Sequence, residues 1–398
     1  MLCSGRYAER FSSYRAEYFA LLLIASAGMM LLSSAQELIT LYVALELATL
    51  PLVALAAFLG DSRSSEAGLK MLLLSALSSG LILYGMALIY GFVGTTEFVT
   101  IGNEIVRGDE PFGGPVLLLA TVLVIAGIGF KIATVPFQMW IPDVYEGAPT
   151  PVTAFLSVAS KSAGFAALLR IFLVAFAPLV QDWSILFGVL AAASMTIGNF
   201  AAIAQSNIKR MLAYSTIAQA GYIMVALAAF HGTGLQVSIG TSALLFYLGG
   251  YTATNLTAFF AIIAITNQTD SETIDDLAGL GRRAPFLALA LALGLISLTG
   301  LPPTVGFMGK LFVFGAAMKS GMVWLVVVGV LNSVVSAYYY LRVVRTMYIS
   351  TSVLPAPVDA TVAIKVALVV TGGIVLLLGV WPSLLLNITD GAALAILP

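Results

Sequence analysis

The amino-acid sequence predicts an all-α protein that crosses a membrane many times. Of its 398 residues 60% are hydrophobic and only 9% are charged, and the apolar residues fall in runs of about 20. Soluble domains carry about 25% charged residues, so an aqueous fold does not accommodate this composition. In lipid, α-helices satisfy their own backbone groups and are the expected spanning elements. A soluble enzyme is therefore excluded.

Charge and metal-ligand content restrict the function further. The 18 Lys and Arg nearly balance the 19 Asp and Glu, and the net charge of −1 gives no field for nucleic acid. One cysteine, Cys3, and one histidine, His231, exclude a disulfide framework, a zinc cluster, iron–sulfur ligation and bis-histidine haem. We expect no cofactor on this chain and assign any redox chemistry to partner proteins.

Breaks at charged and Gly/Pro-rich stretches divide the chain into eleven predicted spans. The first could instead be a signal peptide, since Ser33-Ser34-Ala35 resembles a cleavage site, but the second span follows at once, which favours an uncleaved helix. The predicted spans are 18–34, 37–59, 67–93, 114–135, 150–177, 184–204, 208–230, 235–265, 285–318, 322–347 and 360–382.

The Lys and Arg residues of the connections predict the orientation. Eleven crossings place the two termini on opposite faces, and basic connections remain cytoplasmic. Only Arg107 and Lys319 fall on the C-terminal side. The N-terminal side has Arg6, Arg10, Arg15, Arg63, Lys209, Arg210, Arg282, Arg283, Arg342 and Arg345. We expect a cytoplasmic N-terminus and an outer C-terminus.

Six basic residues remain inside the predicted spans. Arg170 and Lys365 lie near helix ends, where their side chains are expected to reach the membrane surface. A basic residue at a helix centre costs about 2.5–3.5 kcal/mol on insertion scales, so it is a functional candidate by default. The remaining four are Lys70, Lys131, Lys161 and Lys310.

Lys161 lies deepest, about 16 Å into its span at 1.5 Å per residue. Thr153, Ser157 and Lys161 are spaced four residues apart and share one helix face, which forms a polar stripe able to hold water. The alternative is a structural lysine capped by carbonyls of a broken neighbouring helix.

Glu46 lies near the centre of the second span, beside the bend that Pro51 imposes. A buried glutamate needs a partner to stay charged, and Lys70 on the next helix is the expected one. The alternative is that Lys70 pairs with Glu66 four residues earlier as an ordinary helix-end pair.

Lys131 and Lys310 both lie beside predicted helix breaks. Gly127 and Gly129 precede Lys131 and several prolines follow it, while Thr299-Gly-Leu-Pro-Pro303 precedes Lys310. Broken helices leave unpaired backbone groups that are tolerated only against protein or a hydrated cavity. For Lys131 a position at the inner interface, with the side chain reaching water, stays an alternative.

Two further polar stripes follow long predicted helices. One contains Gln219 and the other Tyr251, and with Ser157 these are the auxiliary candidates. Such residues also serve as contacts between helices, which is the alternative. His231 is expected in a solvated outer turn.

The two broken segments are five spans apart. Because five is odd, a repeat of that length is inverted in the membrane, as in many ion-coupled transporters. The predicted organisation is an N-terminal cytoplasmic segment, 1–17, a first five-helix bundle, 18–177, an inverted second bundle, 184–347, and a terminal helix, 360–382.

Residues 129–153, with Pro142-Asp-Val-Tyr-Glu-Gly147, resemble the signature of the antiporter-like membrane subunits of respiratory complex I. Three further segments favour the subunit N family of NADH–quinone oxidoreductase, called subunit 2 in organelles. They are Leu45-Glu-Leu-Ala-Thr-Leu-Pro51, Asn207-Ile-Lys-Arg-Met-Leu-Ala-Tyr-Ser215 and Leu301-Pro-Pro-Thr-Val-Gly-Phe-Met-Gly-Lys310. The resemblance covers residues 17 to 382.

The resemblance implies a proton channel in the bacterial inner membrane, built of two inverted bundles. Glu46 and Lys70 would be the family's glutamate–lysine pair. Lys131 and Lys310 would be the lysines of the broken helices, with Lys161 the central connecting lysine. NADH, FMN, iron–sulfur clusters and quinone would be bound by partner subunits, and the other membrane-arm subunits and lipid would surround the chain.

Bacterial members of this family usually have fourteen helices, and this chain resembles them from the fourth onward. Two other functions stay open on the sequence. One is a subunit of a multi-subunit sodium/proton antiporter or membrane-bound hydrogenase, and the other is a scaffold subunit that conducts nothing.

Overall fold

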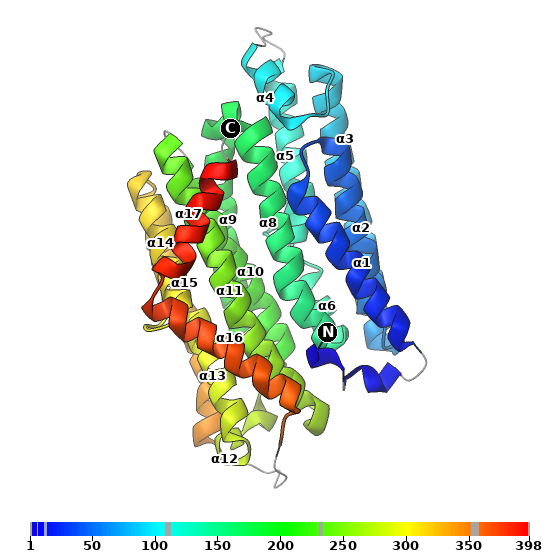
Figure 1. Cartoon of the computed structure of the whole chain (residues 1–398), viewed down its shortest axis with the longest axis vertical. Coiled ribbons are helices and arrows are strands. Elements are labelled where there is room, and N and C mark those ends of the chain that lie inside the picture. The colour runs from blue at the N-terminus through cyan, green and yellow to red at the C-terminus, as the bar shows by residue number, and fades with distance from the viewer. Residues whose placement is uncertain are drawn as a thin grey trace.

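The computed structural model describes residues 2–5, 7–11, 14–107, 113–230, 234–351 and 358–396. Within these ranges the chain is almost entirely helical and has only two isolated β-bridges, so the all-α prediction is confirmed (Figure 1). His231 lies outside the described residues.

The first half of the chain forms a bundle whose fourth span ends at Ile132 and whose fifth span, Thr150–Ala175, contains two π-helical segments. A π-helical segment, Leu156–Ser160, joins α7 to α8, and a second, Ile171–Ala175, follows α8. The helices are α1 (Arg15–Ser34), α2 (Leu38–Ala56), α3 (Ser62–Val93), α4 (Phe98–Arg107), α5 (Gly113–Ile132), α6 (Ile141–Gly147), α7 (Thr150–Phe155) and α8 (Lys161–Arg170).

The second half repeats this order, with its own interruption between α13 and α14. The helices are α9 (Val180–Ile203), α10 (Ile208–Ala228), α11 (Gly234–Thr269), α12 (Leu280–Arg283), α13 (Pro285–Thr299), α14 (Val305–Lys319), α15 (Val323–Ile349), α16 (Val362–Val380) and α17 (Ser383–Ile396).

Ten helical segments of the described chain are long and apolar enough to cross a membrane. Together with the broken α13–α14 pair they correspond to the eleven predicted spans. The prediction missed α17, an apolar helix that begins just after Pro382. In Figure 1, α16 and α17 run end to end at an angle, from the lower part of the molecule to the upper part.

Two pairs of contacts relate the halves to each other. Gly28 lies against the backbone of Ala48, and Gly198 lies against that of Ala218 at the same sequence separation. Each half also has one β-bridge, Glu37 with Glu97 and Asn207 with Thr273. The first bridge lies next to α4 at the upper end of Figure 1 and the second near α12 at the lower end, as an inverted repeat requires.

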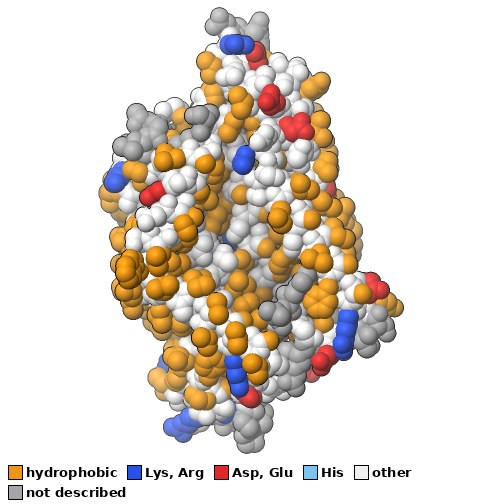
Figure 2. Space-filling view, viewed as in Figure 1, with side chains coloured by type: hydrophobic (Ala, Val, Ile, Leu, Met, Phe, Trp, Pro, Cys, Tyr) orange, Lys and Arg blue, Asp and Glu red, His pale blue; other side chains and the backbone are white. Residues whose placement is uncertain are grey.

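The outer surface is apolar around the middle of the molecule. Figure 2 shows hydrophobic side chains over the centre of one face, with charged side chains gathered toward the upper and lower ends. Large exposed residues include Leu73 and Leu77 on α3, Val334 on α15 and Val369 on α16. Because a water-exposed surface of this kind is unfavourable, we infer that lipid or neighbouring subunits cover it.

We predict that Gly198→Ala destabilises the protein by about 1–3 kcal/mol through overpacking. The new Cβ would lie 2.6 Å from the Ala218 nitrogen and 2.8 Å from the Tyr214 oxygen, so α9 and α10 must separate. Thermal unfolding of the solubilised protein measures the effect. Gly80→Ala on α3 is the control, since its Cβ meets nothing within 4 Å. Equal unfolding temperatures for both variants would contradict the prediction.

Candidate functional site

A cluster of polar groups surrounds Glu46 in the first bundle. Glu46 is half-buried on α2, and the Ser79 hydroxyl of α3 donates a hydrogen bond to its carboxylate. Lys131, only 4% exposed near the end of α5, donates to the hydroxyl of Thr49, one turn after Glu46. Lys131 also lies within electrostatic range of Glu46. Lys131, and not Lys70, is therefore the lysine that is held on α2 beside Glu46.

The expected direct pair of Glu46 with Lys70 is wrong. The Lys70 side chain is 42% exposed, and its ammonium group lies 2.7 Å from Glu66 and 2.6 Å from Asp143. Glu46 instead faces Ser79, about 13 Å further along α3 at 1.5 Å per residue. The alternative pair of Glu66 with Lys70 is confirmed, and Asp143 extends it.

The break after α5 lies inside the protein. Ala133 adopts a left-handed conformation with φ 64°, which ends the helix directly after Lys131. The Ser194 hydroxyl of α9 accepts a hydrogen bond from the Val135 nitrogen at 3.0 Å and contacts the Thr134 hydroxyl at the same distance. A helix of the second bundle thus holds the break of the first, and Lys131 is buried there rather than extended to water.

Lys161 joins the two bundles. It follows the π-helical segment and is 2% exposed, and its ammonium group donates to the backbone carbonyl of Thr216 on α10. It also lies 5.3 Å from the centre of the Tyr251 ring on α11. The carbonyl that caps this lysine belongs to an unbroken helix, in contrast to the sequence alternative of a broken neighbour.

Hydrogen bonds extend from Lys161 along α10 and α11. The Thr216 hydroxyl lies 3.1 Å from that of Tyr251. The Asn255 amide donates to the Tyr251 oxygen at 3.1 Å and to the Ser157 oxygen at 2.7 Å. Ser157 and Tyr251, two of the auxiliary candidates, therefore lie in one buried network beside Lys161.

Gln219, the third auxiliary candidate, continues this network toward α13. It accepts from the Tyr247 hydroxyl at 2.5 Å and donates to the Leu298 carbonyl at 3.0 Å. Gln219, Tyr251 and Ser297 line a cavity of about 10 Å³, enough for about one water molecule.

Lys310 lies at the second break. Its ammonium group donates to the Thr299 carbonyl at 2.8 Å and lies 4.3 Å from the centre of the Tyr222 ring. Gly300, at φ 87°, ends α13, and a Cβ there would come within 2.9 Å of the Lys310 side chain. The glycine thus turns the backbone and makes space for the lysine.

A charged network, which sequence reasoning missed as a site, covers the lower end of the molecule. Arg210 on α10 binds Asp143 at 2.8 Å and Glu146 at 2.6 Å, and Arg63 on α3 also pairs with Glu146. Burial raises the pKa of Asp143, but hydrogen bonds from Lys70 and Arg210 outweigh it and lower that pKa below its usual range. Arg210 and Arg63 lower the pKa of Glu146 in the same way against its burial. The Pro-Asp-Val-Tyr-Glu-Gly motif, which contains both carboxylates, was the feature of the sequence that could have indicated this network.

No group of three His, Cys, Asp or Glu side chains suited to hold a metal ion occurs among the residues that the structure describes. The chemistry that the buried network offers is hydrogen bonding and proton exchange by lysine, hydroxyl and carboxyl groups.

Comparison with known proteins shows extended similarity. Residues 35–336 match the family model described as NADH:quinone oxidoreductase/Mrp antiporter, transmembrane. NADH-quinone oxidoreductase subunit N of Dehalococcoides mccartyi is 44% identical over 398 residues, covering 98% of this chain and 82% of that protein. The subunit N of Moorella thermoacetica is 45% identical over 394 residues, covering 98% and 81%.

Solved structures share the fold. A chain of respiratory complex I from Thermus thermophilus matches with a TM-score of 0.78 and 38% identity, over 93% of this chain and 79% of that one. A chain of an archaeal membrane-bound sulfane sulfur reductase matches with a TM-score of 0.83 and 28% identity, over 96% and 75%. A chain of the Mrp complex from Dietzia matches with a TM-score of 0.83 at 23% identity, over 94% and 77%, which shows the fold alone.

We predict that Asp143→Asn destabilises the protein at pH 7 and that the difference from the parent disappears in acid. A carboxyl group whose pKa is lowered by folding contributes stability above its unfolded pKa and loses it as the pH falls through the folded value. The difference should therefore begin to shrink as the pH falls below about 4, the ordinary pKa of an unfolded Asp, and vanish only below the lower pKa of the folded state. Thermal unfolding between about pH 2 and pH 7 tests this, and a difference that does not shrink as the pH falls would show that lost packing is its cause.

Proposed function

Because this chain belongs to the NADH:quinone oxidoreductase/Mrp antiporter family of membrane subunits, we propose that it moves protons across the membrane as a subunit of NADH–quinone oxidoreductase. The observation that supports this most directly is the bonding of its buried lysines. Lys161 and Lys310 each donate to one neutral backbone carbonyl. A neutral ligand holds an ammonium group without the charge that a carboxylate would supply, so the proton can leave.

The proposed path has a loading pair, a connection and an outlet. Glu46 and Lys131 exchange a proton in the first bundle, Lys161 passes it between the bundles, and Lys310 receives it in the second. Tyr251 and Gln219, with about one water molecule between α11 and α13, bridge Lys161 to Lys310.

Charge repulsion makes such a set of lysines act together. Two ammonium groups about 10 Å apart repel by about 1.7 kcal/mol at an effective dielectric constant of about 20, which changes proton occupancy more than tenfold. Protonation of one lysine thus favours release from the next, and the groups titrate as a coupled set. Moving one proton against 100 mV requires about 2.3 kcal/mol, which quinone reduction in partner subunits would supply.

The proposed setting follows from the charge distribution. The bundles 18–177 and 184–347 would form two half-channels, with 360–382 as a terminal helix. The end with Arg63, Arg210 and their partners would face the cytoplasm of a bacterium, by the excess of basic residues there. Other membrane-arm subunits would contact the apolar surface, while NADH, FMN, iron–sulfur clusters and quinone would be bound elsewhere in the complex.

Sodium/proton antiport and membrane-bound hydrogenase function remain second candidates, because related folds occur in the Mrp complex and in an archaeal respiratory complex. The identity of 44% to subunit N proteins over nearly the whole chain favours the oxidoreductase.

Lys161→Met should assemble into the complex and fail to pump protons, because the thioether cannot bind a proton. Lys161→Arg should fail as well, since its positive charge is kept but its pKa above 12 prevents release. Proton pumping in vesicles per quinone reduced, with quantified assembly, is the measurement. If the chain is instead a scaffold that conducts no protons, complexes with either Lys161 variant should assemble and pump like the parent.

The matched control is Lys319→Met, which removes an exposed lysine at the end of α14 and should leave pumping unchanged. If both Lys161 variants pump like this control, Lys161 carries no proton and the scaffold function is the better explanation.

Glu46→Gln and Lys131→Met should each slow pumping and the coupled quinone reduction, because they remove the loading pair. Lys70→Met should have the smaller effect, since Lys70 is exposed and pairs with Glu66 and Asp143. Quinone turnover and proton pumping of the assembled variants decide whether Lys131 or Lys70 is the lysine that works with Glu46. Glu104→Gln, an exposed residue paired with Arg107, serves as the control.

If Lys70→Met lowers proton pumping as much as Glu46→Gln does, Lys70 belongs to the proton path. Unchanged pumping in both Glu46→Gln and Lys131→Met would remove this pair from it.

A further inference from the structure

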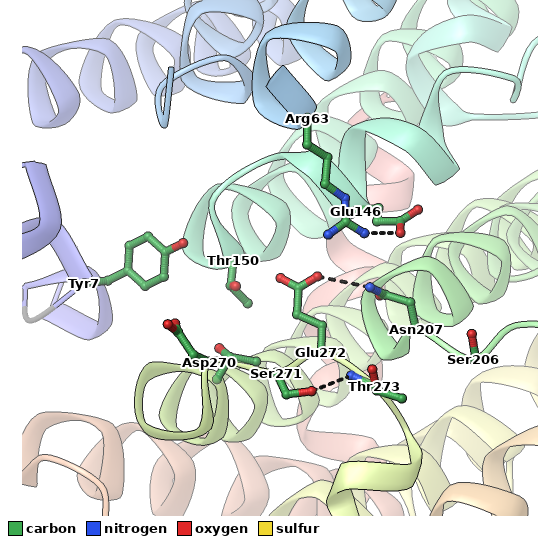
Figure 3. Close-up of a pocket in the computed structure, with 11 residues that line it drawn as sticks. Tyr7, Arg63, Glu146, Thr150, Ser206, Asn207, Asp270, Ser271, Glu272 and Thr273 are labelled. Atoms are coloured by element: carbon green, nitrogen blue, oxygen red, sulfur yellow. Dashed lines mark hydrogen bonds and ion pairs between the residues drawn. The ribbon is translucent and has the colours of Figure 1, made fainter. Parts of the chain in front are cut away.

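A polar cavity of about 480 Å³ opens at the charged lower end, where the two bundles meet (Figure 3). Side chains from α3, α6, α7 and α11 and from the segments before α10 and after α11 surround it. Its lining contains no Leu, Ile, Val, Met or Phe, so it is suited to water. The lining residues are Tyr7, Arg63, Glu146, Thr150, Ser206, Asn207, Thr266, Asp270, Ser271, Glu272 and Thr273.

A buried lysine outside the proposed path lies behind this cavity. The Lys209 side chain, on the first turn of α10, is 2% exposed. Its ammonium group lies 2.8 Å from the Glu272 carboxylate, and it donates to the carbonyls of Ala148 at 2.8 Å and Glu146 at 3.1 Å. Glu272 faces the cavity and is 24% exposed, and Asn207 donates to its second oxygen at 3.1 Å. The pair thus has one member in contact with water and one withdrawn from it.

Two elements connect this pair to Lys161. On α10, Lys209 precedes Thr216 by seven residues, about 10 Å, and Thr216 is the residue whose carbonyl holds Lys161. The cavity residue Thr150 begins α7, and the chain continues from there through Thr153 and the π-helical segment to Lys161.

Tyr145 on α6 contacts both of these elements, since the Thr153 hydroxyl of α7 donates to its carbonyl at 3.1 Å. It is fully buried, directly precedes the cavity residue Glu146, and its hydroxyl interacts with Thr216. The cavity and the central lysine are therefore separated by a short stretch that contains hydroxyl groups.

We propose that this cavity is the aqueous entrance of the proton path and that Glu272 and Lys209 are its first proton carriers. The inference rests on the proposed function and adds two residues and a location to it. Arg63, Glu146 and Asp270 are the other charged groups around the cavity, and they set the field in which the pair exchanges protons.

The proton balance of the step is simple. A hydronium ion in the cavity gives its proton to the Glu272 carboxylate, which becomes neutral and no longer compensates the Lys209 charge. Lys209 then gives a proton onward toward Lys161 and takes the proton of Glu272. The ion pair is restored, one proton has moved, and no other charge has been transferred.

A purely structural function for the pair is the competing explanation. Lys209 does join the α6–α7 connection to α10 and to the segment after α11. Buried ion pairs, however, contribute little net stability compared with apolar packing, because both charges lose hydration. The contact of Glu272 with the cavity is not needed for a structural link, but it is needed for proton uptake.

Glu272→Gln in the complete complex should lower proton pumping by about 100-fold with assembly unchanged, because the amide keeps the shape but cannot carry a proton. Asp275→Asn is the matched control, since Asp275 is exposed three residues further along the same segment, and it should pump like the parent. Pumping of Glu272→Gln at the level of this control would refute the proposal.

Lys209→Arg separates proton transfer from a structural link. Arginine keeps the charge and the ion pair but does not release its proton, so we expect assembly with strongly reduced pumping. Parent-like pumping in Lys209→Arg would show that the pair is only a structural link.

Water access is tested without reference to pumping. In a Cys3→Ser background, Thr266→Cys places a thiol in the cavity, and Thr257→Cys places one on the same helix away from it. A small charged thiol reagent that does not cross membranes should modify the first and spare the second, from one side of the vesicle only. If Thr266→Cys is not modified, the cavity is closed to water and the entrance lies elsewhere.

These results distinguish the two proposals. If Lys161→Met blocks pumping while Glu272→Gln and Lys209→Arg pump like the parent, the entrance is wrong and the proton path stands. If Lys161→Met also pumps normally, the proton path itself is wrong.

Discussion

An ammonium group inside a membrane needs oxygen ligands, and an intact helix offers few of them. Three buried lysines obtain an oxygen ligand in the same way, since each donates to an oxygen of a threonine: Lys131 to Thr49, Lys161 to Thr216 and Lys310 to Thr299. Two of these lysines lie where a helix ends inside the protein, and the third follows a π-helical segment. Lys131 and Lys310 are thus accommodated at broken helices, whereas the oxygen that holds Lys161 belongs to the unbroken α10.

The inverted repeat explains why two such breaks occur. Each half begins with two helices whose backbones nearly touch, at Gly28 and Gly198, and each has a β-bridge that joins the start of its second helix to the segment after its third. The two halves also support each other, because Ser194 of the second bundle holds the break beside Lys131 in the first. The break beside Lys131 is therefore not a feature of the first bundle alone.

At the lower end of the molecule, basic groups pair with carboxylates rather than with threonine oxygens. There Asp143, Glu146 and Glu272 each have a basic partner, and Arg210 contacts two of the three. These ion pairs link α3, α6 and α10, so they hold the two bundles together around a polar cavity. Three of these charged groups, Arg63, Glu146 and Glu272, also line that cavity.

The sequence by itself determined the helical class, the spans, the two breaks and the lysines beside them, because hydrophobic run length and Gly/Pro placement are local properties. It also proposed Ser157, Gln219 and Tyr251 as auxiliary candidates, each by its place in a polar stripe along its own helix. The partner of Glu46 required the tertiary structure. Lys70 is nearer in sequence, but only the packing of α2 against α3 and α5 brings Lys131 to Glu46 and leaves Lys70 with Asp143. The ion pair of Lys209 and Glu272 could not be predicted from the sequence either. A contact between distant segments depends on how helices pack, and helix periodicity does not specify that packing.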